Sequence, residues 1–135
     1  MDQTALVTGA SGGIGRAIAL LLSRKGHQLF LLGRDKSKLS AVTAECNDTS
    51  GRASYLAGDM LDPTYLEAIR EGIKADFGHI DILINNAGGA IRGPVYKSSA
   101  KDWNELVELN VGIALKLCNL VLPSMINHQR GAIIN

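Results

Sequence analysis

The chain has 135 residues, of which 46% are hydrophobic and 20% charged, values that favour one soluble globular domain over a disordered or fibrous chain. Its net charge of +1 provides no long-range basic field, which argues against nucleic acid or an anionic membrane as the main partner. Hydropathy predicts no membrane span, and the first strand begins too close to Met1 for a secretory signal, so a cytoplasmic location is expected.

The first feature of the chain is an apolar run at residues 5–7 that leads into a glycine-rich turn at residues 8–15. Gly9, Gly13 and Gly15 allow the backbone to turn tightly, to approach a ligand closely and to pack the following helix against a sheet. The free N–H groups at the start of such a helix suit an anion, for example a pyrophosphate. The pattern therefore predicts a strand, a phosphate-binding turn and a helix.

The helix after this turn is predicted to end at Lys25 and Gly26, a last-turn cation followed by a C′ glycine. Four apolar residues at helical spacing are expected to form its buried stripe: Ile14, Ile18, Leu21 and Leu22. The next run, residues 29–32, is continuously apolar, as a strand buried on both faces of a parallel sheet requires. Gly33 and Arg34 close that strand.

A second helix is predicted behind Asp35, whose carboxylate can accept a hydrogen bond from the first helical turn as an N-cap. Apolar residues keep helical spacing as far as Cys46, and a polar turn follows. A weaker strand is then predicted at residues 53–57, closed by Gly58 and Asp59.

The third helix is expected to begin at Asp62 and Pro63, an N-cap followed by an N1 proline, and to stop at Gly78. A short buried strand is predicted at residues 80–84. It leads directly into the motif Asn-Asn-Ala-Gly at residues 85–88.

A long helix is predicted from a cap at Ser98 or Ser99 to residue 122, where Pro123 bends or ends it. Its inner stripe is expected to contain six apolar residues: Trp103, Leu106, Val107, Ile113, Leu117 and Val121. Residues 132–135 form a fifth predicted strand.

Five strands that alternate with about four helices, at intervals of roughly thirty residues, predict right-handed crossovers in a parallel sheet. The fold class is therefore α/β, a three-layer Rossmann-type doubly wound sheet truncated after strand five, with residues 1–135 as a single domain. In such a sheet the ligand lies beyond the carboxyl ends of the strands. We expect the polar residues at 8–15, 33–34, 58–59 and 85–89 to line one crevice there.

Metal binding is not predicted, because the three histidines and two cysteines show no ligand spacing. Cys46 and Cys118 each occupy an apolar helical position and are expected to be reduced thiols in the core. Reduced thiols agree with a cytoplasmic compartment.

The glycine turn, an aspartate after the third strand and Asn-Asn-Ala-Gly after the fourth together resemble the short-chain dehydrogenase/reductase family. The run from Asp81 to Ile84, and Trp103 with Asn110 in the next helix, are similar to its 3-oxoacyl-(acyl-carrier-protein) reductase-type members. The resemblance extends over the whole chain but covers only the first half of a typical member. It implies an NAD(P)(H)-dependent oxidoreductase that transfers a hydride between nicotinamide and a carbonyl or an alcohol.

The resemblance also implies where the cofactor would bind. Residues of the glycine turn would surround the pyrophosphate and its riboses: Gly9, Ser11, Gly12, Gly13, Ile14 and Gly15. Asp59 resembles the aspartate that hydrogen-bonds the adenine amino group, with Met60 beside it. Three residues resemble the part of the family's backbone that lies along the adenosine ribose: Asn86, Ala87 and Gly88.

Asn110 resembles the helix asparagine of the family's catalytic tetrad, which helps to hold a proton-relay water. It lies on an otherwise apolar helical stripe, where a buried amide needs hydrogen-bond partners. The serine, tyrosine and lysine of the tetrad have no counterpart, and none of the three tyrosines is followed by a lysine four residues later. The resemblance therefore implies a cofactor site without a proton donor, and the chain is expected to be inactive alone.

The end of the second strand bears on the choice of cofactor. NAD-selective enzymes usually place an acid there to bind the ribose 2′-hydroxyl, whereas this chain has Gly33. Arg34 follows, and a guanidinium suits a 2′-phosphate, so NADP(H) is favoured over NAD(H). Against this preference, Gly12 stands where many NADP-preferring relatives have a second basic residue, and Asp35 would weaken phosphate binding.

Each assignment has a simpler alternative. The glycine turn could be an ordinary strand-to-helix loop, Arg34 a solvated cation and Asp59 a strand terminator. Asn85 and Asn86 could hold buried loop backbone while also lining the site. Asn110 could be a satisfied core amide with no present catalytic role, and the missing tetrad members favour that interpretation.

Two hypotheses about function follow. The first is the cofactor-binding half of an NADP(H)-dependent short-chain dehydrogenase/reductase, and the second is a non-catalytic nucleotide-binding or assembly module. A methyltransferase with the same sheet would want an acid after the second strand, which Gly33 and Arg34 do not offer. The uncovered edge beside the fifth strand and the long helix at 99–122 predict a homo-oligomer, and an isolated chain that is marginal or self-associating.

Overall fold

The computed structural model describes residues 3–135, which form one five-stranded sheet with the strand order β3-β2-β1-β4-β5. The strands are β1 (Thr4–Thr8), β2 (Gln28–Gly33), β3 (Arg52–Ala57), β4 (Ile82–Ile84) and β5 (Ala132–Ile134). All neighbouring pairs are parallel. The chain proceeds from β1 outward to β3 and then returns to the other side of β1, so the strand order reverses between β1 and β4. This topology confirms the predicted doubly wound sheet.

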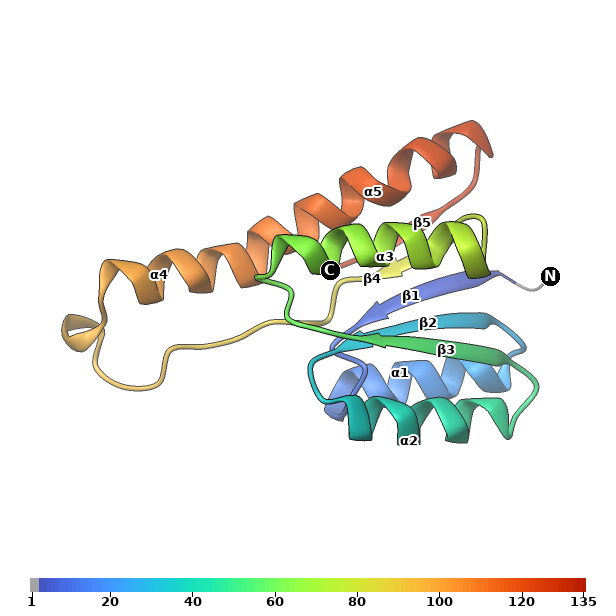
Figure 1. The fold of residues 1–135 in the computed structure, drawn as a ribbon, viewed down its shortest axis with the longest axis horizontal. Helices are drawn as coiled ribbons and strands as arrows, with labels where there is room; N and C mark the ends of the chain where they lie inside the picture. The colour runs from blue at the N-terminus through green and yellow to red at the C-terminus, as the bar shows by residue number, and fades with distance from the viewer. Residues whose placement is uncertain (1–2) are drawn as a thin grey trace.

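Helices cover both faces of the sheet. The helices α1 (Gly13–Arg24) and α2 (Lys36–Asn47) lie on one face, and α3 (Pro63–Asp76) and α5 (Ile113–Asn127) lie on the other (Figure 1). A 3-10 turn, η1 (Val95–Lys97), then α4 (Ala100–Val107) and a π-helical turn, η2 (Glu108–Gly112), precede α5. The result is the predicted three-layer arrangement, with a helical arm that extends beyond the carboxyl ends of the strands (Figure 1).

The central strands β1 and β2 are buried on both faces because their side chains alternate between two cores. In β1, Leu6 joins the cluster under α3 and α5, whereas Ala5 and Val7 join the cluster under α1 and α2. All three are fully buried. A continuous apolar run is therefore the correct sequence signal for these central strands.

The predicted helix caps are present. The Asp35 carboxylate accepts a hydrogen bond from the Lys38 N–H at 3.0 Å, and the Asp62 carboxylate accepts one from the Thr64 N–H at 2.9 Å. Of the two serines proposed for the long helix, Ser99 is the cap, and it forms a reciprocal capping box with Asp102. These hydrogen bonds hold the pKa of Asp62 and the pKa of Asp102 below the ordinary aspartate value.

The buried stripe of α1 differs from the prediction. Ile14 and Leu21 are 73% and 54% exposed, and the fully buried residues of the helix are Gly15, Ala19 and Ser23. Ile18 and Leu22 are partly buried and pack against the core, as predicted. At Gly15 a side chain would collide with the Gly9 carbonyl, so a small residue faces the glycine turn there and Ile14 lies outward.

The long helix also departs from its predicted inner stripe. Ile113, Leu117 and Val121 are buried, but Trp103 is 37% and Val107 60% exposed, because α4 projects past the sheet and has no layer beneath it (Figure 1). Pro123 lies inside α5, which continues to Asn127, so the proline does not end the helix. The buried side chains on either side of the proline keep the last turns on the sheet.

The expectation that no stretch is long and apolar enough for a membrane span is wrong for this helix. Residues Ala100–Asn127 form a helix of 28 residues with a window of mean hydropathy 1.6, of which 22% is buried. A helix that packs in a core or against another subunit has the same composition.

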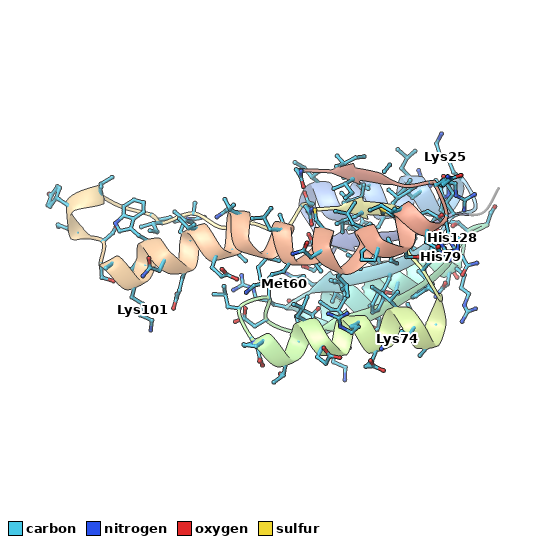
Figure 2. All side chains as sticks on the ribbon, turned by 90° about the horizontal axis from the view of Figure 1, so that it is seen from above. Lys25, Met60, Lys74, His79, Lys101 and His128 are labelled. Carbon is cyan, nitrogen blue, oxygen red and sulfur yellow. The ribbon has the colours of Figure 1, made fainter. Side chains whose placement is uncertain are left out.

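A buried carboxylate ties the sheet together at the end opposite the arm. Asp81, 2% exposed, accepts hydrogen bonds from the Thr4 N–H at 2.9 Å and from Arg130 Nε and Nη2 at 3.0 and 2.7 Å. His79 Nε2 lies 3.3 Å from the same carboxylate, and its ring stacks on His128 with a centroid separation of 4.6 Å. Figure 2 shows both histidines at this end of the molecule. We call this group the Asp81 clasp.

The clasp joins β1, the segment before β4 and the connection from α5 to β5. Burial by itself would raise the pKa of the Asp81 carboxyl, but the hydrogen bonds from Thr4 and Arg130 outweigh burial and hold that pKa below its ordinary value. A carboxyl whose pKa is lower in the folded state stabilises the fold above its unfolded-state pKa. The stabilisation is lost as the pH falls through the folded-state pKa.

We expect Asp81→Asn to lower the free energy of unfolding by about 2 kcal/mol at pH 7, because it weakens hydrogen bonds to a charged acceptor. The difference from the parent chain should shrink at pH 3, below the ordinary aspartate pKa of about 3.9. Urea denaturation at the two pH values measures both quantities. Asp76→Asn, at an exposed carboxylate, is the control and should change stability by less than about 0.5 kcal/mol. Equal losses in the two variants would contradict the role of the clasp.

Candidate functional site

A cavity of about 750 Å³ lies beyond the carboxyl ends of the strands, beside the point where the strand order reverses. Its walls come from the glycine turn, the loops after β2, β3 and β4, and the π-helical turn η2. The lining residues are Gly9, Ser11, Gly33, Arg34, Asp35, Lys38, Gly58, Asp59, Met60, Leu61, Asn86, Ala87, Gly88 and Leu109. Figure 2 shows Met60 at the side of the body from which the arm extends, far from His79 and His128.

The cavity brings together most of the residues proposed from the sequence. Those that line it are Gly9, Ser11, Arg34, Asp59, Met60, Asn86, Ala87 and Gly88. The other four turn residues, Gly12, Gly13, Ile14 and Gly15, are outside this lining and form the cap and first turn of α1. Four segments that are distant in sequence thus converge on one crevice.

Two glycines allow the turn after β1 to touch the loop after β4. Gly9 has a φ of +64°, and a Cβ built on it would lie 2.9 Å from Asn86 Nδ2. A Cβ on Gly15 would collide with the Gly9 carbonyl oxygen and lie 2.7 Å from the same amide nitrogen. Gly15 therefore acts by packing, since any side chain there would push the helix off the turn.

Thr8, which the sequence argument did not single out, is central to this contact. Its hydroxyl oxygen accepts hydrogen bonds from the Asn86 N–H at 3.0 Å and the Ala87 N–H at 2.8 Å, and its hydroxyl donates to the Ile84 carbonyl at 3.3 Å. Thr8 is 1% exposed. The signal available in the sequence was a hydroxyl residue at a strand end opposite a loop whose backbone N–H groups need acceptors.

The amide of Asn86 completes the junction. Its Nδ2 donates to the carbonyls of Thr8 at 3.1 Å and Gly9 at 3.3 Å. Asn85 joins the loop to the far strand instead, since its N–H donates to the Ile134 carbonyl at 2.9 Å and its Nδ2 to Asn135 Oδ1 at 2.8 Å. Both asparagines hold loop backbone while lining a cavity, so the two interpretations offered from sequence are compatible.

Asn110 lies in the π-helical turn and is exposed, so the expectation of a buried core amide is wrong. Its side chain nevertheless has partners: Nδ2 donates to the carbonyls of Gly89 at 3.0 Å and Leu106 at 2.9 Å, and Oδ1 accepts from the Gly89 N–H at 3.3 Å. A Cβ on Gly88 would lie 2.7 Å from Oδ1. The amide is exposed because the helix reaches the sheet only from Ile113 onward.

A second cavity of about 260 Å³ adjoins the first and shares residues 86–88 with it. Four asparagines line it: Asn85, Asn86, Asn110 and Asn135. The Asn85 Oδ1 atom is buried and has no hydrogen-bond partner among residues 3–135. This second cavity is therefore the more polar continuation of the crevice toward β5.

Charge in the main cavity gathers after β2. Arg34 follows the strand, Asp35 caps α2, and Lys38, which sequence reasoning missed, reaches the cavity from the first turn of that helix. A Cβ on Gly33 would lie 3.4 Å from Ser11 Oγ, so the glycine turn is directly beside this group. Because residue 33 is a glycine, no acidic side chain stands at the end of β2.

Asp59 has two roles at the end of β3. Its Oδ1 accepts a hydrogen bond from the Leu61 N–H at 2.9 Å and its carbonyl accepts one from the Asp62 N–H at 3.0 Å, so it shapes the turn. The residue also lines the cavity. Asp59 can therefore shape the turn and also contact a ligand in the cavity.

The tyrosines are not placed for proton transfer in the crevice. Burial raises the pKa of Tyr65 to about 12, and its hydroxyl donates to the Leu56 carbonyl. Tyr96 is 84% exposed on η1, and Tyr55 is in β3, while neither is among the residues that line the two cavities. A tyrosine that serves as a general acid and base needs a lowered pKa and access to the reacting group.

Among residues 3–135, no group of three histidine, cysteine, aspartate or glutamate side chains is placed to hold a metal ion. Cys46 is buried, as expected of a core thiol, and burial raises the pKa of its thiol. Cys118 is only half-buried, with its sulfur 3.9 Å from Asn85 Nδ2.

A doubly wound sheet with a glycine turn and a crevice at its switch point defines the class of Rossmann-type nucleotide-binding folds. Within that class the chain belongs to the short-chain dehydrogenase family, whose model matches residues 3–135. This match confirms the family resemblance seen in the sequence motifs.

The chain is similar to proteins of known sequence and structure over nearly its whole length. It is 36% identical to an uncharacterized oxidoreductase of Staphylococcus saprophyticus, over 99% of this chain and 58% of the relative. It is 34% identical to the 3-oxoacyl-[acyl-carrier-protein] reductase of Escherichia coli, over 98% of this chain and 53% of the relative. A metagenomic short-chain oxidoreductase solved in complex with NADP is 39% identical, with a TM-score of 0.91 over 98% of this chain and 61% of that one. The chain thus spans little more than half the length of these relatives.

We expect Thr8→Val to lower the free energy of unfolding by about 2 kcal/mol, because it leaves two loop N–H donors without an acceptor. Hydrogen exchange should show faster exchange at the Asn86 and Ala87 amides. Thr43→Val is the matched control, since Thr43 is also buried but its hydroxyl donates only to the Leu39 carbonyl within α2. Similar losses in the two variants, with exchange at Asn86 unchanged, would contradict this role of Thr8.

Proposed function

We propose that the chain binds NADP(H) and supplies the cofactor-binding part of an oxidoreductase that transfers a hydride between nicotinamide and a carbonyl or an alcohol. The observation that carries the proposal is the 750 Å³ crevice, which joins the glycine turn, Arg34, Asp59 and the loop at residues 86–88. Membership of the short-chain dehydrogenase family and the similarity to a structure in complex with NADP support it.

In this proposal each wall of the crevice binds a different part of the cofactor. The turn at Gly9 and Ser11 faces the pyrophosphate and its riboses, together with the helix start at residues 12–15. Asp59 and Met60 lie along the adenine. The backbone at residues 86–88 lies along the adenosine ribose, in a position held by Thr8. The bound nicotinamide would supply or accept the hydride.

Cofactor preference is proposed to depend on the end of β2. Because Gly33 has no side chain, no carboxylate competes with a 2′-phosphate there, and Arg34 offers a guanidinium from the next position. A carboxylate at position 33 would instead accept hydrogen bonds from a ribose 2′-hydroxyl. A Cβ at position 33 would be in ordinary van der Waals contact with Ser11 Oγ and Leu39 Cδ2, at 3.4 Å each, so such a side chain would begin beside the glycine turn.

The proposal gives Asn110 the task of positioning a water molecule for proton transfer, from a turn that is hydrogen-bonded to Gly89. The observations on Tyr65 and Tyr96 favour a chain that binds the cofactor without turning over substrate by itself. The same observations support the second candidate function, a non-catalytic nucleotide-binding or assembly module. Turnover distinguishes the two.

Calorimetric titration of the chain with NADPH and NADH tests the cofactor site. We expect NADPH to bind at least about tenfold more tightly, since hydrogen bonds to a charged group contribute about 1.5–3 kcal/mol. Gly33→Asp should reverse this order by adding a carboxylate beside the 2′-position. Absence of binding by either dinucleotide would contradict the proposed function, and steady-state reduction of carbonyl substrates with NADPH would exclude the non-catalytic module.

We also propose that the chain self-associates through the helix at Ala100–Asn127. Apolar side chains follow its outer face, and their exposed fractions are 52% at Val111, 62% at Leu115 and 70% at Ile126. A bilayer is the less suitable environment, because Leu117 and Met125 on the inner face are already packed in the core. In this proposal the protein works in the cytoplasm, with neither a membrane nor nucleic acid as a partner.

We expect Leu115→Lys to shift the chain toward monomer in sedimentation equilibrium, because it places a charge in an apolar interface. Leu21→Lys is the matched control, at a leucine that is 54% exposed on the opposite face of the sheet, and it should leave the association constant unchanged. A parent chain that is monomeric at all concentrations would contradict the proposed interface.

A further inference from the structure

We infer that Lys38 is a specificity-determining residue for the cofactor, a second cation that pairs with the 2′-phosphate of NADP(H) beside Arg34. The inference rests on the proposed function and extends it to a residue outside the sequence motifs. It also answers the two objections to NADP(H) raised by the sequence, the lack of a basic residue at Gly12 and the presence of Asp35.

Lys38 lines the same cavity as Arg34, although it comes from α2 and not from the strand end. Gly33 lines this cavity too, and its Cβ position is 3.4 Å from Ser11 Oγ and from Leu39 Cδ2. The two cations therefore line the same cavity as the end of β2 and the glycine turn. A 2′-phosphate is the part of the cofactor that would stand in this part of the cavity.

The Asp35 carboxylate is the N-cap of α2. Its Oδ1 accepts a hydrogen bond from the Lys38 N–H at 3.0 Å, and its Oδ2 lies 3.8 Å from Lys38 Nζ. Because the carboxylate caps α2, that backbone N–H is not free to bind a phosphate. Attraction for a phosphate at this end of the crevice must come from side chains.

The charges near the end of β2 decide how much attraction is available. Arg34 and Asp35 together carry no net charge, whereas a phosphate monoester carries about −1.5 to −2 at pH 7. Lys38 makes the group of three net positive. Without it, Arg34 alone would have to oppose both the phosphate and the Asp35 carboxylate.

The Lys38 side chain is also free to move toward a ligand. It is 70% exposed, and its ion pair with Asp35 spans 3.8 Å, a solvent-screened contact of little strength. A phosphate in the partly enclosed cavity is a more highly charged acceptor than the Asp35 carboxylate. The flexible Lys38 side chain would therefore extend so that its ammonium group pairs with the phosphate.

Lys36 provides a matched comparison within the same helical turn. It begins α2, is exposed and is not among the residues that line the cavity. Removal of either lysine changes the net charge of the chain by the same amount. A general electrostatic effect would therefore appear in both variants, and a local contact only in one.

Calorimetric titration with 2′,5′-ADP and 5′-AMP, two fragments that differ in the 2′-phosphate, tests the inference. Lys38→Gln should weaken 2′,5′-ADP by about tenfold and change 5′-AMP by less than about twofold. Lys36→Gln should change both by less than about twofold. Lys38→Arg should retain the preference, since it keeps the charge.

Asp35→Asn gives a test of opposite sign. Asparagine is an equally good N-cap, so α2 should keep its start while one negative charge near the phosphate is removed. We expect this variant to bind 2′,5′-ADP several-fold more tightly and 5′-AMP as before.

The outcomes separate this inference from the proposed function. If the parent chain prefers 2′,5′-ADP and NADPH but Lys38→Gln keeps that preference, Lys38 is not the second cation and the proposed function stands. If Lys36→Gln weakens binding as much as Lys38→Gln, the effect is general charge and the inference is wrong. If the parent chain binds none of these ligands, the proposed function and the inference both fail.

Discussion

The end of β1 and the loop after β4 are joined at the hydroxyl of Thr8, and the geometry of the crevice depends on this contact. The hydroxyl accepts two N–H groups of the loop after β4, while the Asn86 amide returns hydrogen bonds to the turn after β1. The approach is so close that Gly9 and Gly15 cannot carry side chains. Glycine therefore shapes the site indirectly, by allowing two loops to share one set of hydrogen bonds.

This junction explains which parts of the molecule could be predicted from the sequence. Continuous apolar strands, caps such as Asp35 and Asp62, and polar residues at strand ends are local signals, and they predicted the sheet and the position of the crevice. Thr8 and Lys38 were not singled out in this way, because the role of each depends on neighbours in space that no motif in the sequence specifies.

The errors share one physical cause. Helical spacing shows which residues of a helix are apolar, but it does not show what lies against them. Ile14 turned outward because the closest contact of α1 admits only small residues, and Trp103 is partly exposed because its helix extends past the sheet. The exposure of Asn110 follows from the same extension. An apolar stripe in a sequence therefore predicts which residues are buried only where another layer of the fold packs against that side of the helix.

The Asp81 clasp and the crevice lie at opposite ends of the same strands. Effects of substitutions at sites far apart and without shared partners usually add. The persistence of the fold and the recognition of a ligand can therefore vary independently along the length of β1 and β4. Substitutions in the crevice can therefore change which ligand binds without weakening the Asp81 clasp. The stability that the clasp contributes would then offset the destabilising effect of those substitutions.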